Sequence, residues 1–193
     1  MPMDYNYYEL RLSRRPAVQR SIADHVYKSL GDQAIGVFSP LLGFASNQSL
    51  VLTDAKAPSE AVMGAPGVVS AERHSLTPTL RPRDGARPPA GGIYVHNWFT
   101  VDAEGFDEFV KLSGEAWPDF EARFATKIFG LFALRPSKDD LLEGARRLLL
   151  MTGYRDLGEW QKSRDPTSSA MKVFARRGEV TRVSLARACI LVT

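Results

Sequence analysis

Polar and hydrophobic positions in the first 76 residues follow an order that predicts a small α+β unit. Residues 5–13 alternate between the two classes, as a strand with one buried face does. Hydrophobic side chains then recur at every fourth position from Val18 to Leu30, which is typical of a helix packed on a sheet, and Pro16 suits its first turn. Pro40 indicates an edge or a bulge in the next strand. The later elements are expected at 33–44 (strand), 49–55 (strand), 58–63 (short helix) and 68–76 (strand).

The same order of patterns begins again in the second part of the chain. A strand alternates so that Tyr94, His96 and Trp98 share one face, while the opposite face is apolar. The helix that follows has a strongly aromatic face, and Pro118 inside it predicts a kink or a division into two helices. The expected elements are a strand at 91–101, a helix at 103–124, strands at 127–134 and 146–154, helical segments at 156–165 and 168–177, and a last strand at 180–193.

Each part therefore has the order strand, helix, strand, strand, helix, strand, which is the ferredoxin-like order. Residues 77–91 are dense in Pro, Gly and Arg and are expected to link a first half, 1–76, to a second half, 92–193. A four-stranded sheet with helices on one face leaves its other face bare. We expect an α+β fold in which tandem ferredoxin-like halves cover each other as a dimeric α/β-barrel does. The pattern leaves open whether the halves pair within one chain or between chains.

Composition and charge limit the classes of partner that the protein is expected to bind. The net charge is +3, but the basic residues are scattered, so we expect no nucleic acid as a partner. No stretch is apolar enough to span a membrane, and no apolar core follows a basic head at the N-terminus. A cytoplasmic protein without a membrane partner is therefore expected. The single cysteine, Cys189, sits in an apolar run and is interpreted as a buried, unreactive thiol.

Several stretches of the chain resemble bacterial NIPSNAP-domain proteins. They are YYELRLS and AIGVFSPLLGF in the first half, and GGIYVHNWF, LSGEAWPDFEARF, GLFALRP and LLLMTGYRDLGEWQKSRDP in the second. The resemblance extends over residues 7–192 and implies the fold of the dimeric α/β-barrel superfamily, with a homo-oligomer such as a dimer. It implies no particular reaction. Relatives in that superfamily include cofactor-free monooxygenases, haem-degrading enzymes, chlorite dismutase-like haem proteins and isomerases.

His96 is the candidate catalytic residue, because it lies between Tyr94 and Trp98 on the mixed face of a strand. It could act as a general base, a hydrogen-bond donor to a substrate or an axial haem ligand, although no motif indicates haem. Thr152 and Tyr154, from a neighbouring strand, are expected on the same face. The structural alternative is that His96 is a hydrogen-bonded packing residue.

The other candidate ligand-binding residues are Trp117, Tyr154, Trp160 and Arg164. Core packing is the favoured interpretation of the two tryptophans, and the position of Arg164 near a helix C-terminus needs no ligand. Its guanidinium could still hold an anionic group. His74, near a strand end, has no carboxylate in a recognisable motif and receives no role. No metal-binding motif, dinucleotide fingerprint, phosphate loop or nucleophile elbow is present.

Two functions remain open. The first is an enzyme or binding protein that holds a small apolar or aromatic ligand in a barrel pocket, with His96 as its polar group. The second is a structural or interaction module without catalysis, whose barrel is filled by its own aromatic side chains. They differ in whether a cavity borders His96.

Overall fold

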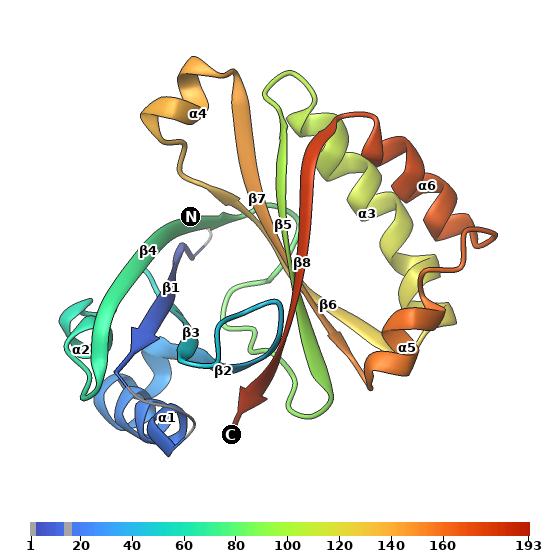
Figure 1. Cartoon of the computed structure of the whole chain (residues 1–193). Helices are drawn as coiled ribbons and strands as arrows, with labels where there is room; N and C mark the ends of the chain where they lie inside the picture. The colour runs from blue at the N-terminus through green and yellow to red at the C-terminus, as the bar shows by residue number, and fades with distance from the viewer. Residues whose placement is uncertain (1–2, 14–16) are drawn as a thin grey trace.

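Eight strands form one closed antiparallel barrel in the computed structural model, which describes residues 3–13 and 17–193 (Figure 1). Around the barrel the strands follow the order β1-β3-β2-β8-β5-β7-β6-β4. Their bounds are β1 (Tyr5–Leu12), β2 (Ala34–Leu42), β3 (Gln48–Asp54), β4 (Val68–Pro78), β5 (Ile93–Asp102), β6 (Thr126–Leu134), β7 (Ala145–Tyr154) and β8 (Thr181–Val192).

The helices lie outside the barrel, with α1 and α2 beside the strands of the first half and α3 and α6 beside those of the second (Figure 1). Their bounds are α1 (Ala17–Leu30), the 3-10 turn η1 (Gly31–Gln33), α2 (Glu60–Met63), α3 (Phe106–Arg123), α4 (Lys138–Leu142), α5 (Leu157–Lys162) and α6 (Ser169–Gly178). No described helix is long and apolar enough to cross a membrane. Pro16 and the side chain of Val18, which we used to predict α1, lie outside the described residues.

Pro118 does not divide the second-half helix, contrary to one of the two outcomes predicted for it. Helix α3 runs without a break through this proline. Its buried residues on either side, including Phe109, Trp117 and Phe120, pack in one cluster against the sheet. Burial of this aromatic face favours one continuous helix over the local preference of proline to end it.

The two halves have the same strand order. Hydrogen bonds connect β4-β1-β3-β2 in the first half and β8-β5-β7-β6 in the second. Two seams join them: β2 pairs with β8, with a register shift after Pro40, and β4 pairs with β6 through residues 76–78. The prediction of a bulge at Pro40 is confirmed. The ring therefore closes within a single chain.

Residues 77–91 are held by specific contacts rather than forming a free connector. Strand β4 continues to Pro78, two residues past the expected boundary. Arg81 forms an ion pair with Glu121 of α3 at 2.7 Å, and Arg87 donates to the carbonyl oxygen of Ala34 at 2.6 Å. The segment thus packs on both halves.

Three apolar clusters form the core. One fills the inside of the barrel, one lies between the second-half strands and α3 and α6, and one lies beneath α1 and α2. Strand alternation assigns each side chain to the inner or the outer clusters. On β5, the inner face carries Tyr94, His96 and Trp98, as predicted.

Candidate functional site

His96 lies at the centre of the barrel and is fully enclosed. Its Nδ1 is 3.0 Å from the hydroxyl oxygen of Tyr7, and its Nε2 is 3.5 Å from the sulfur of Cys189. The ring of Phe38 meets the imidazole edge to face at 4.8 Å. Both ring nitrogens of His96 are therefore engaged by other side chains of the barrel.

The enclosure of His96 determines its protonation state and whether a haem iron could reach it. Burial lowers the pKa of His96 to about 3, so the imidazole is neutral at pH 7. Burial also raises the pKa of the Cys189 thiol, which supports its interpretation as unreactive. No room is left for the iron of a haem beside either nitrogen of His96, so the residues around it do not fit an axially ligated haem.

Thr152 and Tyr154 do not share the face of His96, contrary to our expectation. In the pairing of β5 with β7, His96 is opposite Met151, and Tyr94 is opposite Gly153. Directly paired residues of antiparallel strands point to the same side, so Thr152 and Tyr154 point outward. Tyr154 indeed packs in the cluster beneath α3 and α6.

Trp98 marks the end of the barrel where the packed interior opens, which we call the barrel mouth. Its ring meets those of Tyr7 at 5.5 Å and His74 at 5.1 Å, both edge to face. Among the described residues, its buried indole Nε1 has no hydrogen-bond partner. Trp98 therefore packs its ring against a second histidine and keeps its indole N–H buried without a partner.

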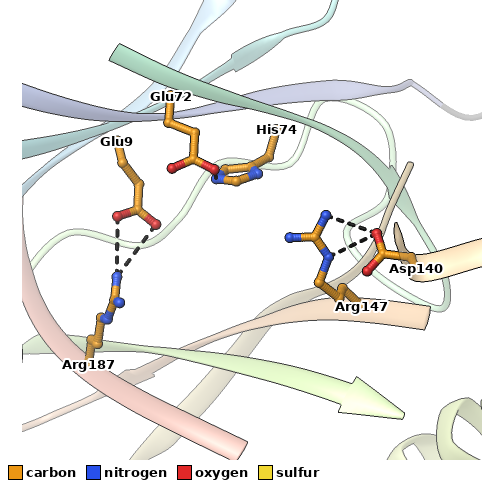
Figure 2. A network of polar contacts seen from close by, with 6 residues as sticks. All are labelled: Glu9, Glu72, His74, Asp140, Arg147 and Arg187. Atoms are coloured by element: carbon orange, nitrogen blue, oxygen red, sulfur yellow. Dashed lines mark hydrogen bonds and ion pairs between the residues drawn. The ribbon is translucent and has the colours of Figure 1, made fainter. Parts of the chain in front are cut away.

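Three charged contacts surround this end of the barrel (Figure 2). The guanidinium of Arg187 on β8 donates to the carboxylate of Glu9 on β1 at 3.2 Å. Nε2 of His74 lies 3.5 Å from the carboxylate of Glu72, also on β4. Across the opening, Arg147 on β7 donates through Nε and Nη2 to Asp140 of α4 at 3.1 and 2.9 Å.

The surroundings at the barrel mouth lower the pKa of His74 and raise the pKa of Glu9. Burial is the largest cause that lowers the pKa of His74; the Arg147 charge lowers it further, and Glu72 opposes both. Burial likewise raises the pKa of Glu9, with a contribution from Glu72, against the stabilising charge of Arg187. His74 is therefore neutral at pH 7 and can accept a proton.

A hollow of about 280 Å³ opens beside His74. It is lined by Glu72, Arg73, His74, Ser75, Leu134, Arg135, Pro136 and Arg147. We did not predict this site, because β4 and β7 belong to different halves and only closure of the barrel brings them together. The sequence does carry one signal: Glu72 and His74 are two residues apart in a strand, so they share a face.

The other predicted ligand-binding residues lie away from the barrel mouth. Trp117, Trp160 and Arg164 belong to the outer layer of the second half, and Tyr94 lies inside the barrel. Trp117 lies on the buried face of α3, with the guanidinium of Arg81 5.2 Å from its ring. Trp160 is partly buried in the same cluster, and the guanidinium of Arg164 lies 5.9 Å from its ring. Tyr94 points into the barrel but toward its other end, where its hydroxyl donates to the carbonyl of Pro89 at 2.6 Å.

A larger hollow, of about 900 Å³, adjoins the first over the seam between β4 and β6 and shares five of its lining residues, Arg73, Ser75, Leu134, Arg135 and Pro136. Its walls come from β1, β4, β6 and α3 and mix Asp4 and Asp107 with Arg73, Arg135 and Arg146. It contains no histidine, and its charges of both signs indicate no particular ligand. No three metal-ligating side chains gather closely enough to hold an ion among residues 3–13 and 17–193. We therefore favour the smaller hollow at the barrel mouth.

Comparisons with known proteins identify the fold. A protein from Fusobacterium nucleatum subsp. nucleatum, proposed to be a monooxygenase, matches with a TM-score of 0.63 and 9% identity, over 100% of this chain and 93% of its own. An anthrone oxidase-like protein matches with a TM-score of 0.63 and 14% identity, over 100% and 92%. An uncharacterised ferredoxin fold protein from Listeria monocytogenes, related to antibiotic biosynthesis monooxygenases, matches with a TM-score of 0.52 and 8% identity, over 100% and 96%.

These matches support an α+β fold of the dimeric α/β-barrel type with ferredoxin-like order. No protein-family model matches the chain, and no curated protein matches it by sequence. At such low identity the likeness concerns the fold alone. The chemistry has to be argued from the barrel mouth itself.

Proposed function

We propose that this protein binds a small aromatic ligand at the barrel mouth and that His74 accepts a proton from it. The observation that carries this proposal is the position of a neutral imidazole, held between Trp98 and Glu72, at the edge of a hollow. A general base must be unprotonated at the working pH and must border the bound ligand; the lowered pKa of His74 and its place in the wall of the hollow suit both requirements.

Each neighbour of His74 has a separate role in this proposal. The ring of Trp98 packs edge to face behind the imidazole of His74 and fixes its orientation toward the hollow. Arg147 uses Nε and Nη2 for Asp140, and Figure 2 shows its third nitrogen turned away from that carboxylate. This nitrogen can bind a ligand oxygen on which negative charge develops after the proton has left. Glu72 stabilises His74 once it is protonated.

Two structural neighbours, an anthrone oxidase-like protein and a protein proposed to be a monooxygenase, suggest an oxidisable aromatic compound as the probe. Anthrone loses a proton and is oxidised by O₂ to anthraquinone and water, which absorbance follows directly. We expect the wild-type protein to accelerate this conversion and His74→Gln to lower the acceleration about hundredfold or more, as loss of a general base does.

The matched control is His25→Gln, because His25 lies on α1, outside the barrel. It is expected to leave the rate unchanged. Absence of acceleration by the wild-type protein, together with no change in tryptophan fluorescence on adding 1-hydroxy-2-naphthoate, would refute the proposal. Equal rates in His74→Gln and wild type would refute the role of His74 alone.

A second candidate function is a structural or interaction module without catalysis. The packed barrel centre favours it, because His96, Tyr7, Phe38 and Cys189 fill the space that a ligand in the lumen would need. This candidate predicts that neither anthrone nor the naphthoate perturbs the mouth.

We also propose a family, a division into two halves, a cellular location and an oligomeric state for this protein. We propose membership of the bacterial NIPSNAP-domain proteins on the stretches quoted above. A division into related halves, 1–76 and 92–193 with 77–91 between them, is supported by their common strand order. A cytoplasmic location and a homo-oligomer rest on the sequence and the resemblance. Since the ring closes within one chain, an oligomer would have to form through an outer surface.

A further inference from the structure

Arg177, on α6, is a buried cation whose charge no carboxylate balances. Only 9% of the residue is exposed. Its guanidinium lies over three phenyl rings, those of Phe99 at 4.9 Å, Phe109 at 4.8 Å and Phe174 at 4.4 Å. Among the described residues, no acid lies within 4.0 Å of its nitrogens, whereas most other buried or half-buried arginines here have such a partner.

The hydrogen bonding of Arg177 is also incomplete. A guanidinium has five N–H groups. Nη1 of Arg177 donates to the hydroxyl of Ser113 at 3.1 Å, and this is the one oxygen that the described residues supply to it. The hydroxyl of Ser113 in turn donates to the carbonyl of Phe109 at 2.7 Å. Several strong donors thus remain in a site from which water is largely removed.

An uncompensated buried cation lowers stability, and cation–π contacts offset only part of that cost. Burial, together with the nearby charge of Arg164, lowers the pKa of Arg177 to about 10, which still leaves it charged at pH 7. A structural role alone would be served as well by an apolar side chain of similar length. The arrangement is explained if an anion supplies the missing charge.

An open cleft leads to this cation. It has a volume of about 370 Å³ and lies between α6 and the outer face of β5 and β8, on the other side of the sheet from the barrel mouth. Arg164 and Lys172 also line it, and it contains no acidic residue. Its apolar walls are Phe99, Met171, Phe174 and Pro166.

We propose that this cleft binds a small organic anion, with Arg177 and Arg164 holding its acidic group and the side chains of Phe99, Met171 and Phe174 covering its apolar part. Charge-assisted hydrogen bonds from two guanidinium groups suit a carboxylate, and the aromatic walls exclude water from the contact. The site is separate from the barrel mouth and does not depend on the function proposed there.

Octanoate is a suitable probe, because it joins a carboxylate to an apolar chain that fits the cleft. In protein labelled with ¹³C at methionine methyl groups, octanoate is expected to shift the signal of Met171, which lines the cleft. The signal of Met151, inside the barrel, is expected to stay in place. Octanol, which has no charge, serves as the probe control and should cause no comparable shift.

Arg164→Gln tests the charge without disturbing the core, because Arg164 is exposed. The Kd for octanoate from calorimetry should rise about tenfold or more. Arg176→Gln removes an equal charge from α6, outside the cleft, where Arg176 pairs with Glu108, so it should change the Kd less than about twofold. Arg177→Met is expected to abolish the shift of Met171. His74→Gln should leave octanoate binding unchanged, which separates this site from the mouth.

Three results would overturn the proposal. They are an unchanged Kd in Arg164→Gln, a persistent Met171 shift in Arg177→Met, and no shift of Met171 in the wild type at about 10 mM octanoate. An equal response to octanol would likewise show that the cleft recognises apolar chains and not anions.

Discussion

His96 and His74 point into the same barrel from strands of different halves, yet their surroundings differ completely. His96, at the centre, is enclosed by Tyr7, Phe38 and Cys189 and has both ring nitrogens engaged. His74, at the mouth, touches Trp98 on one side and a largely exposed carboxylate on the other, next to a hollow. Both imidazoles are neutral at pH 7, but only His74 can meet a ligand.

The comparison shows that the position of a histidine along the barrel axis, more than its residue type, determines whether it packs in the core or is available to a ligand. At the centre, aromatic rings fill the cross-section and a polar group survives only when it is fully hydrogen bonded. At the mouth, ion pairs accompany the aromatic contacts of Trp98, and a hollow borders the side chains (Figure 2). Substitutions at the two levels should therefore have effects of different kinds.

The largest expected effect is on stability at the barrel centre. His96→Ala should lower the free energy of unfolding by about 3 kcal/mol, because it opens a cavity and leaves the hydroxyl of Tyr7 without its partner. His74→Ala should lower it by less, about 1–2 kcal/mol, since His74 borders a hollow and its removal leaves no buried hydroxyl without a partner. Urea unfolding of both variants measures the difference. Similar losses in the two variants would contradict the contrast between centre and mouth.

The pH dependence of stability offers a second measurement at the centre. The folded pKa of His96 is about 3, below the value of about 6.5 in an unfolded chain, so the unfolded state binds the proton more readily. Its contribution to stability is complete above pH 6.5 and is lost as the pH falls below that value. Between pH 7 and pH 5 this residue alone should remove about 2 kcal/mol from the free energy of unfolding.

The control for this pH effect is His96→Gln, which keeps a hydrogen-bonding side chain but cannot titrate. Its loss of stability between pH 7 and pH 5 should be smaller than that of the wild type by about the same 2 kcal/mol. Parallel curves for the two proteins would show that His96 takes up its proton in the folded state.

A smaller effect is expected at the mouth, where Arg187 compensates the partly buried Glu9. Arg187→Met should lower the free energy of unfolding at pH 7 by about 1–2 kcal/mol, because the carboxylate of Glu9 loses its cation. The loss should shrink below the pKa of Glu9, where that group is protonated. Adding Glu9→Gln to Arg187→Met should recover part of the stability, and a double-mutant cycle without coupling would contradict this prediction.

Much of the fold could be predicted because its signals are local. Alternation along β5 placed Tyr94, His96 and Trp98 on one face, and the element order of both halves followed from short patterns. The position of Thr152 and Tyr154 was predicted wrongly for a physical reason. Strand β7 is apolar on both faces, since one packs in the barrel and the other beneath the helices, so its sequence does not reveal its register.

The candidate site depends on long-range closure and was therefore missed. His74 acquires its neighbours Trp98 and Arg147 from strands of the other half, and no local pattern records which strands face each other across a barrel. The unbalanced charge of Arg177 was hidden for a similar reason, because its phenyl neighbours come from β5, α3 and α6. Only a three-dimensional arrangement shows that a cation lacks an acid.

The contact between Tyr7 and His96 bears on how independently the two halves of the barrel can accept substitutions. β1 and β5 hold equivalent places in the strand order, so in a barrel made of two identical subunits the two strands would have the same sequence. Every substitution would then be present in both subunits, and its two copies would have to be compatible with each other. Because one chain encodes both sides, a tyrosine can face a histidine, and a substitution alters one wall while the opposite wall stays as it was. A single asymmetric site can thus arise in a scaffold whose two halves share one strand order.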